Sequence, residues 1–294
     1  MSHWFLLLLL AALWSPSFLA IKIGLQDIPP LSLAAARLAI ASLLTYGLMR
    51  WRGNSLPITL EFWKKFAVMG LFANALPFAL LMIGETLASS ALAAIVSGFT
   101  PVGTAVIAHF AIEGERLRGR TLIGIAMGFV GIGVLFLPAL LSQPGGQHDE
   151  NNVLLGLIAF AVMALSYSVA GVYGRKTLRG YPQFVGPTAQ LIAATVLLLP
   201  FVLVFEWSQL RVPAAPAFGA ALWLGVVATG FAYVVYYRLL EISSATFLSL
   251  VTFLLPPFGA LIGVMFLGEH LAWNAMVGCG MILAGAGFVR NTEE

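Results

Sequence analysis

The chain contains the same segment twice, once in each half. The earlier copy runs from Glu85 to Leu117 and the later copy from Glu241 to Leu271. The copies align at an offset of 156 residues through a Pro-x-Gly motif. From a Gly-Glu pair onward the offset is 154, because the earlier copy holds two extra residues. Self-similarity at a fixed offset is typical of a duplicated structural unit. The chain is therefore expected to fold as two related halves.

The duplication extends over nearly the whole chain, although the third apolar run matches the eighth only weakly. At an offset of 153 residues the matched positions are Trp14-Ser15 with Tyr167-Ser168, Lys22 with Arg175, Pro29 with Pro182, and Arg37 with Gln190. At an offset of 154 they are Gly124, Met127, Gly131 and Gly133 with Gly278, Met281, Gly285 and Gly287. These matches predict one unit at 1–137, a polar linker at 138–152 and a second unit at 153–290.

The composition places both units in a membrane. With 60% hydrophobic and 9% charged residues, the chain has too little polar surface for a soluble globule. A membrane-spanning helix needs roughly 20 apolar residues, and ten such runs follow one another. They lie near 4–24, 31–49, 65–84, 88–110, 119–137, 153–174, 183–204, 217–238, 243–266 and 271–289. The first run is interpreted as a helix and not a signal peptide, since no Lys or Arg precedes it. The predicted fold class is an all-α polytopic membrane protein with ten transmembrane helices.

Five helices per half is an odd number, so the second half must enter the membrane from the opposite side. The predicted architecture is therefore two inverted five-helix repeats. Basic residues favour the cytoplasmic side. With both termini cytoplasmic and the linker periplasmic, the inner side holds twelve of the fifteen Lys and Arg residues. These are Arg50, Arg52, Lys64, Lys65, Arg116, Arg118, Arg120, Arg175, Lys176, Arg179, Arg238 and Arg290. Lys22, Arg37 and Arg211 fall on the outer side or within the membrane.

The sequence lacks the motifs that are typical of several functional classes of protein. Cys279 is the single cysteine, which excludes an intrachain disulfide and a thiolate metal site. No Gly-x4-Gly-Lys-Ser/Thr loop for a nucleotide and no metal-ligand spacing occurs. We discount a nucleic-acid partner despite the basic isoelectric point, because loop position explains the basic residues better. We therefore expect no enzyme activity, no catalytic residues, no metal and no cofactor, with a small-molecule substrate and the lipid bilayer as partners.

Four motifs resemble the EamA family of the drug/metabolite transporter superfamily. They are W-x7-K closing the first run, P-x6-A-R entering the second, P-x-G inside the fourth, and G-E-x-L leading into the fifth. The resemblance covers nearly the whole chain but does not specify a substrate. It implies a ten-helix carrier in which helices 1–4 and 6–9 surround a central cavity. Helices 5 and 10 would lie outside this ring, and members export amino acids, other metabolites or drugs.

The candidate substrate-binding residues are polar and aromatic side chains at mid-helix depth. They are Trp14, Ser17, Asn74, Phe78, Ser97, Thr100, Tyr167, Tyr233, Ser249, Thr252 and Phe253. Several are three or four residues apart, which places them on one helical face. For any single hydroxyl, a hydrogen bond back to its own helix is the simpler interpretation. As a set they predict a neutral, aromatic cavity that suits an amphipathic or aromatic substrate.

Charged residues form a second group of candidates, for gating or charge pairing. Arg37 lies about 10 Å into the second run at ~1.5 Å per residue, where a charge costs roughly 2.5–3.5 kcal/mol. It either snorkels to headgroups or carbonyls, or faces the cavity. In the cavity it would bind a substrate carboxylate, or pair with Glu85 or Asp27 at an outer gate. Lys22, at the outer end of the first run, is a weaker candidate.

Glu85 and Glu241 are repeat counterparts that either stabilise a helix N-terminus or act as gate residues on opposite faces. Glu115 and its counterpart Glu269 are interpreted as caps at the entrances of the fifth and tenth helices.

Prolines and glycines suggest where helices bend and where they pack. Pro101, and the pair Pro256 and Pro257, are predicted either to hinge the fourth and ninth helices or to kink them statically. Glycine faces on the fifth and tenth runs permit close helix approach. We expect each of these helices to pack onto its own half in a monomer, with a dimer through the glycine faces as the alternative.

The sequence thus predicts a secondary transporter of the bacterial inner membrane. It would export a small organic metabolite, such as an aromatic or other amino acid, by alternating access. A multidrug or organic-cation exporter, with or without proton coupling, is the first alternative. It is weakened because every acidic residue falls near a helix end. A non-transport membrane scaffold is the second alternative, and it leaves the repeat without a purpose.

Overall fold

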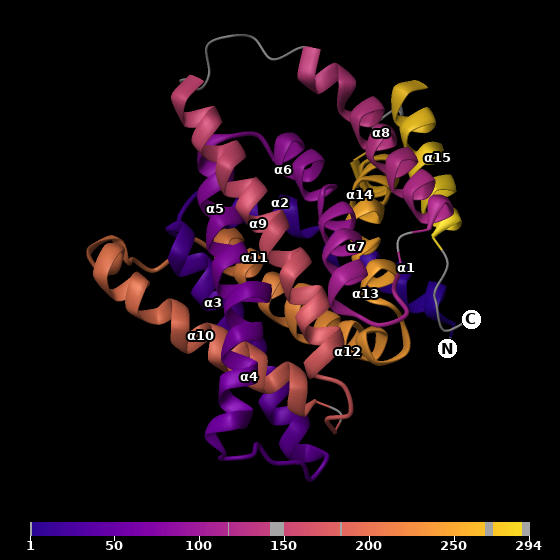
Figure 1. Cartoon of the computed structure of the whole chain (residues 1–294). Coiled ribbons are helices and arrows are strands. Elements are labelled where there is room, and N and C mark those ends of the chain that lie inside the picture. Colours follow the sequence, from indigo (N-terminus) through magenta and orange to yellow (C-terminus); the bar gives the residue numbers. More distant parts are fainter. Residues whose placement is uncertain (1, 117, 142–149, 183, 268–272, 290–294) are drawn as a thin grey trace.

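The computed structural model describes residues 2–116, 118–141, 150–182, 184–267 and 273–289. Every regular element in these ranges is a helix. The helices cross one another in one bundle, with the α8–α15 pair at one side (Figure 1). Several positions used above lie outside the described residues, namely Leu117, Gly268, Glu269, Leu271, Arg290 and most of the linker at 138–152.

The described helices follow the predicted apolar runs closely. The first half holds α1 (His3–Trp14), α2 (Ser17–Gly24), α3 (Pro30–Trp51), α4 (Leu60–Gly70), η1 (Leu71–Ala75), α5 (Leu76–Leu87), α6 (Ser90–Ser97), α7 (Thr100–Ala111) and α8 (Gly119–Leu141). The second half holds α9 (Glu150–Thr177), α10 (Val185–Phe205), η2 (Trp207–Gln209), α11 (Ala215–Gly225), η3 (Val226–Phe231), α12 (Ala232–Ile242), α13 (Ala245–Ser249), α14 (Val251–Leu267) and α15 (Trp273–Phe288).

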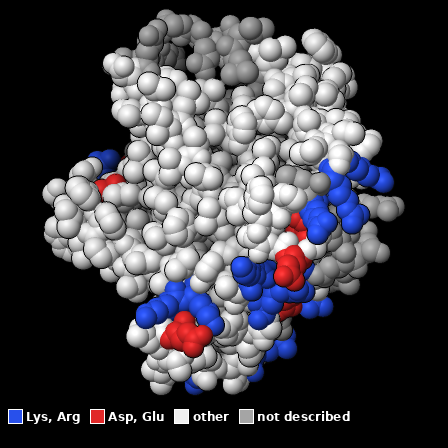
Figure 2. Space-filling model, viewed as in Figure 1, with Lys and Arg blue, Asp and Glu red and all other residues white. Residues whose placement is uncertain are grey.

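The helices have the length and the surface of a multi-pass membrane protein. Within the described ranges, seven helical spans, some of which join two or three of the helices above, are long and apolar enough to cross a bilayer. Three more apolar helices are shorter. The seven spans are His3–Gly24, Pro30–Trp51, Leu60–Leu87, Leu92–Ala111, Asn151–Thr177, Val185–Phe205 and Ala215–Ile242. Large apolar side chains such as Leu43, Phe110 and Val204 point outward from the bundle. In Figure 2 most charged side chains lie over the lower part and the right side of the molecule, with a small group at the left edge, while the top is white where it is described.

Several runs are interrupted at points that the sequence only partly indicated. The first breaks at Ser15–Pro16, the fourth at Gly98–Phe99 and the ninth at Leu250. The third and eighth instead widen into the π-helices η1 and η3 near their middles. The first residues of η1 and η3 are 155 positions apart, so the two runs with the weakest sequence match share the rarest backbone feature. π-Helical turns are rare and frequently mark functional sites.

Two motifs of the repeat pack against each other across the halves. Ser15 Oγ donates to the Leu255 carbonyl at 3.1 Å, and a Cβ on Gly259 would lie 3.5 Å from that Oγ. The counterpart Ser168 Oγ shares its hydrogen between the Thr100 carbonyl at 3.0 Å and the Ala164 carbonyl of its own helix at 2.9 Å. A Cβ on Gly103 would lie only 2.5 Å from Ser168 Oγ. Ser168 therefore needs the glycine at position 103 in the other half, whereas a Cβ at position 259 would make only an ordinary contact with Ser15.

The fifth and tenth helices contact their own halves, α8 through α6 and α15 through α14, but their main contact is with each other. Glycines of α8 and α15 face each other, so that the two helices pack together across the halves. A Cβ on Gly131 would lie 2.8 Å from the Gly278 carbonyl oxygen, and one on Gly278 would lie 2.6 Å from that of Gly131. These glycine positions are therefore used within one chain.

Candidate functional site

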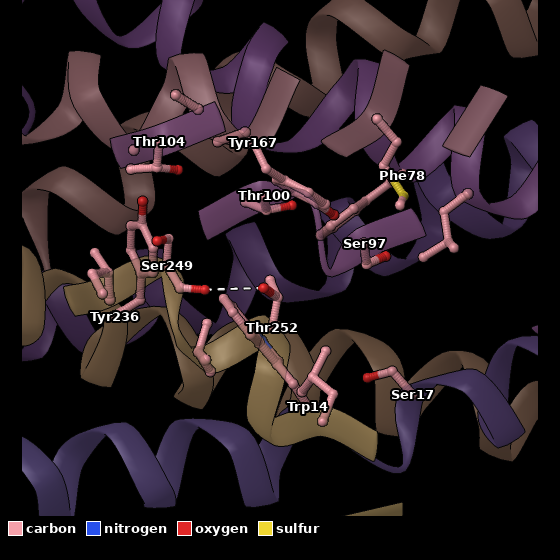
Figure 3. A pocket seen from close by; sticks show the side chains of 18 of the residues that line it. Trp14, Ser17, Phe78, Ser97, Thr100, Thr104, Tyr167, Tyr236, Ser249 and Thr252 are labelled. Carbon is pink, nitrogen blue, oxygen red and sulfur yellow. Dashed lines mark hydrogen bonds between the residues drawn. The ribbon is translucent and has the colours of Figure 1, made fainter. Parts of the chain in front are cut away.

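A cavity of about 120 Å³ lies among helices of both halves. Its walls are formed by α1, α2, α3, η1, α5, α6 and α7 of the first half and by α9, α12, α13 and α14 of the second. Figure 3 shows Thr104, Thr100, Tyr167 and Phe78 on one wall and Ser249, Thr252 and Trp14 on the facing wall. Among the described elements, α8 and α15 contribute no lining residue.

The structure brings together nine of the eleven side chains that were predicted to bind substrate. They are Trp14, Ser17, Phe78, Ser97, Thr100, Tyr167, Tyr233, Ser249 and Thr252. Trp14 lies with its ring centroid 6.4 Å from Tyr233 and 6.2 Å from Tyr236, and the two tyrosine rings are 5.6 Å apart. Centroid separations of this size are those of interacting aromatic rings. The lining thus includes a continuous aromatic cluster on α1 and α12.

Asn74 lies behind the cavity wall and does not line it. It is the fourth residue of η1 and is completely buried. Its amide nitrogen donates to Tyr233 Oη at 2.5 Å, and its amide oxygen accepts from Gln190 Nε2. Gln190 Oε1 in turn accepts from Tyr237 Oη at 2.6 Å. Asn74 therefore connects α10 and α12 to η1, so its contacts in this structure are with protein groups.

Phe253 also lies outside the cavity lining. Its ring packs toward glycines of α6–α7 and α8, since a Cβ on Gly128 would lie 2.5 Å from the ring and one on Gly98 would lie 3.7 Å from it. The break at Leu250 separates α13 from α14, so the spacing from Ser249 to Phe253 does not keep both on one face of a regular helix. The aromatic ring here fills the space that two missing side chains leave.

Three of the lining hydroxyls hydrogen-bond to their own helices, as single hydroxyls commonly do. Ser97 Oγ donates to the Ala93 carbonyl at 2.7 Å. Ser249 Oγ donates to the Thr246 carbonyl at 2.7 Å, and Thr252 Oγ1 donates to the Ser249 carbonyl at 3.0 Å (Figure 3). These three hydroxyls already donate their hydrogens, so toward the cavity they can only accept hydrogen bonds.

Other polar atoms of the lining have no partner among the described residues. They are Trp14 Nε1, Ser17 Oγ, Thr100 Oγ1 and Thr104 Oγ1, all buried. Leaving a buried polar group unpaired costs about 1–3 kcal/mol. These groups can therefore hydrogen-bond to a molecule or water in the cavity.

Arg37 reaches the cavity from α3 and is only 3% exposed. Its Nε donates to Thr229 Oγ1 at 2.6 Å, and Nη2 contacts the Ala228 carbonyl at 3.4 Å; both partners belong to η3. Its Cζ lies 4.0 Å from the ring centroid of Phe78, a distance typical of a cation–π contact. The structure does not pair Arg37 with either carboxylate considered above. Asp27 instead accepts from the Ala214 backbone nitrogen at 3.0 Å.

The other charged candidates lie outside the cavity lining. Lys22 is exposed on α2, whereas its counterpart Arg175 is buried with Nε 3.7 Å from Glu115 Oε1. Glu85 is half-buried near the end of α5. Glu241 pairs with Arg238 at 3.1 Å, and its backbone carbonyl accepts from Arg175 Nη1 at 3.5 Å and from Arg179 Nη2.

Glu115 is a cap, but of a different helix from the one expected. Its Oε1 accepts from the Ala245 backbone nitrogen at 3.0 Å and its Oε2 from that of Thr246 at 3.4 Å. It therefore caps α13 in the other half, near the inner-side candidate Glu241, and does not cap α8.

The proline candidates occupy different positions relative to the helix breaks. Pro101 lies in the first turn of α7, directly after the break at Gly98–Phe99. Proline is well tolerated there, because a first-turn residue has no helical partner for its N–H. Pro256 and Pro257 lie inside α14, several residues beyond the break at Leu250. Both sites lie close to an interruption, as a bend requires, but the two breaks are not at matching repeat positions.

Sequence reasoning missed several residues of this region. Thr104 and Tyr236 line the cavity, and each follows a predicted residue by three or four positions, so helical spacing could have found them. Thr229 and Gln190 were missed for a different reason. Their partners depend on the π-helices, which no sequence pattern indicated. Among the described residues, no group of three or more His, Cys, Asp or Glu is placed to hold a metal ion.

Several known proteins are similar to this chain over most of its length. The chain is 25% identical to an uncharacterized transporter, YoaV, of Bacillus subtilis over 93% of its own length and 91% of that protein. It is 24% identical to the uncharacterized inner membrane transporter YedA of Escherichia coli, over 92% and 85%. It is 23% identical to a Chlamydia trachomatis protein named an S-adenosylmethionine/S-adenosylhomocysteine transporter, over 98% and 89%.

One solved crystal structure superimposes with a TM-score of 0.80 at 24% identity and covers 98% of this chain and 96% of its own, which shows the shared fold. A model of the EamA-like transporter family matches residues 2–137 and again residues 154–291. The chain therefore belongs to the EamA-like transporter family and is a membrane transporter.

Proposed function

We propose that this protein is a secondary carrier that exports a small organic metabolite of amino-acid size across a bacterial inner membrane. In this proposal the chain crosses the membrane ten times, as inverted five-helix halves at 1–137 and 153–290 joined by a periplasmic linker at 138–152. Both termini are cytoplasmic. Transport proceeds by alternating access, in which a single site is exposed to one side and then to the other.

The observation that carries the proposal is the cavity built from elements of both halves. A midplane site between two repeats is how many secondary carriers place substrate between two gates. The contacts of Ser15 with Leu255 and of Ser168 with Thr100 hold first-half helices against second-half helices around this cavity. Relative movement of the halves would therefore change the cavity and its access together.

The size and the charge of the cavity favour a small metabolite over a drug or an organic cation. Its volume of about 120 Å³ is well below the ~300–1,000 Å³ of pockets that take drug-sized ligands. Arg37 is the charged residue of the lining, which contains no Asp or Glu among the described residues. A cationic substrate would meet a like charge and no acidic partner.

Counterflow in proteoliposomes tests the proposal. Purified protein would be reconstituted in vesicles loaded with one unlabelled compound, and uptake of the same labelled compound would be followed. The panel comprises the common L-amino acids, nucleosides, cationic drugs and, because one relative is named for it, S-adenosylmethionine. We expect protein-dependent counterflow for at least one amino acid and none for the cationic drugs. Absence of counterflow for every compound would contradict a carrier function, and counterflow of cationic drugs alone would favour the multidrug alternative.

A further inference from the structure

Arg37 carries a buried positive charge that no acidic side chain in the described residues balances. Arginine has five N–H donors and cannot be deprotonated in a protein. Only two of its nitrogens have hydrogen-bond partners here, and those partners are a hydroxyl and a carbonyl of η3. A buried charge without a counter-charge is costly. The surplus charge and donors border the cavity, so a molecule in the cavity is positioned to neutralise them.

The repeat counterpart of Arg37 in the second half shows which side chain is sufficient for the structural contact made at this position. Arg37 and Gln190 are repeat counterparts, and each bonds to the fourth residue of a π-helix in the opposite half. Arg37 bonds to Thr229 of η3, and Gln190 bonds to Asn74 of η1. A neutral amide is therefore sufficient for this contact with the π-helix in one half. Both the nitrogen and the oxygen of the Gln190 amide form hydrogen bonds with protein groups. The contact between position 37 and η3 therefore does not require a charged side chain.

We infer that Arg37 binds a carboxylate group of the transported molecule. The guanidinium fork matches a carboxylate in two parallel hydrogen bonds. Elsewhere in the same lining, the Ser17, Thr100 and Thr104 hydroxyls have no partner among the described residues. The aromatic cluster of Trp14, Tyr233 and Tyr236 offers an apolar face. The class of substrate is thus a small carboxylate or amino acid with an apolar or aromatic body, and this inference rests on the proposed transport function.

Paired ligands test the inference on the unaltered protein. Thermal stabilisation and equilibrium binding would be measured in detergent with the common L-amino acids and with 3-phenylpropionate, each beside its carboxamide. The carboxamide keeps the shape but removes the negative charge. We expect at least one acid to bind, and its carboxamide to bind roughly 10–100-fold more weakly, as for the loss of a hydrogen-bonded charge pair. Equal binding within every pair, or no binding by any acid, would overturn the inference. Stabilisation by chloride alone would overturn it too.

Two variants test the residue itself. Arg37→Gln copies the side chain that the second half already accommodates, so the fold and the contact with η3 are expected to persist. It should weaken the acid roughly 10–100-fold and leave the carboxamide within about threefold. Arg37→Lys keeps the charge without the fork, and it should retain an intermediate affinity. If Arg37→Gln weakens acid and carboxamide equally, Arg37 has only a structural role.

The outcomes also separate this inference from the proposed function. Counterflow confined to compounds that lack a carboxylate, such as nucleosides or cationic drugs, would uphold a carrier and reject the carboxylate. Arg37-dependent binding of an acid without any counterflow would uphold the carboxylate site and reject the carrier.

Discussion

At the scale of single residues, glycines decide how closely helices of the two halves approach. A Cβ on Gly124 would lie 2.5 Å from the Gly285 carbonyl oxygen, which is closer than atoms can pack. We expect Gly124→Ala to force α8 and α15 apart and to lower the free energy of unfolding by about 1–3 kcal/mol, as overpacking does. The unfolding midpoint in detergent, followed by circular dichroism, would measure this loss.

Gly133→Ala is the matched control on the same helix. A Cβ on Gly133 meets nothing within 4 Å, and alanine favours a helix over glycine by roughly 1 kcal/mol. This variant is expected to be as stable as the parent or slightly more so. If both variants lost the same free energy of unfolding, the close approach of α8 and α15 would not be the reason for a glycine at position 124.

Residue-level prediction succeeded where side-chain chemistry and helical spacing were sufficient. Ser97 and Thr100 line the cavity as predicted, because hydroxyls inside an apolar run need a polar partner or cavity. Phe253 was placed wrongly because the sequence does not reveal the break at Leu250 or the small residues beside the ring. An aromatic ring is as well suited to such a gap as to a cavity wall, so its type alone could not decide between them.

At the scale of elements, the two π-helices tie each half to the other. Asn74 of η1 holds Gln190 of α10 and Tyr233 of α12 in one buried hydrogen-bonded chain. Asn74→Leu keeps the branched outline of the side chain, although it is somewhat larger, and leaves the Gln190 amide without its acceptor. We expect it to lower the free energy of unfolding by about 1–3 kcal/mol, the cost of an unsatisfied buried polar group. Thermal unfolding in detergent is the measurement.

Thr195→Val on α10 provides the control for that loss. Thr195 Oγ1 donates only to the Leu191 carbonyl of its own helix at 2.8 Å. That carbonyl keeps its backbone role in α10 when the hydroxyl is removed, so the variant should be nearly neutral. A destabilisation by Thr195→Val that equals that of Asn74→Leu would mean that any polar deletion in this part of the bundle is equally harmful.

The existence and approximate limits of the helices could be predicted, but their interruptions could not. Apolar length determines where a helix can lie in a membrane, and the predicted runs therefore match the described helices closely. A π-helix depends on which carbonyls find new partners in neighbouring helices, as the Phe72 carbonyl does with Ser166 Oγ at 2.7 Å. That partner is 94 positions away, and no local pattern in 71–75 or 226–231 reports it.

At the scale of the whole molecule, the two halves are interlocked and not merely joined. Trp14-Ser15 of the first half packs near the Pro-x-Gly segment of the second, and Tyr167-Ser168 does the reverse. Neither half buries these groups alone, so each is expected to need the other for a stable fold. This exchange gives the repeated motifs a structural reason, which complements the transport role proposed for the cavity between them.

The proposed inversion predicts that two exposed, equivalent connections lie on opposite sides of the membrane. Ser55 lies between α3 and α4, and Ser208 lies in η2 between α10 and α11, so they occupy equivalent connections of the two halves. In a Cys279→Ser background, which removes the single native cysteine, Ser208→Cys should react with a membrane-impermeant maleimide in intact cells. Ser55→Cys should react only after permeabilisation, because the proposed topology puts it in the cytoplasm beside the basic residues of the inner side. Labelling of both cysteines from the same side of the membrane would contradict the inversion.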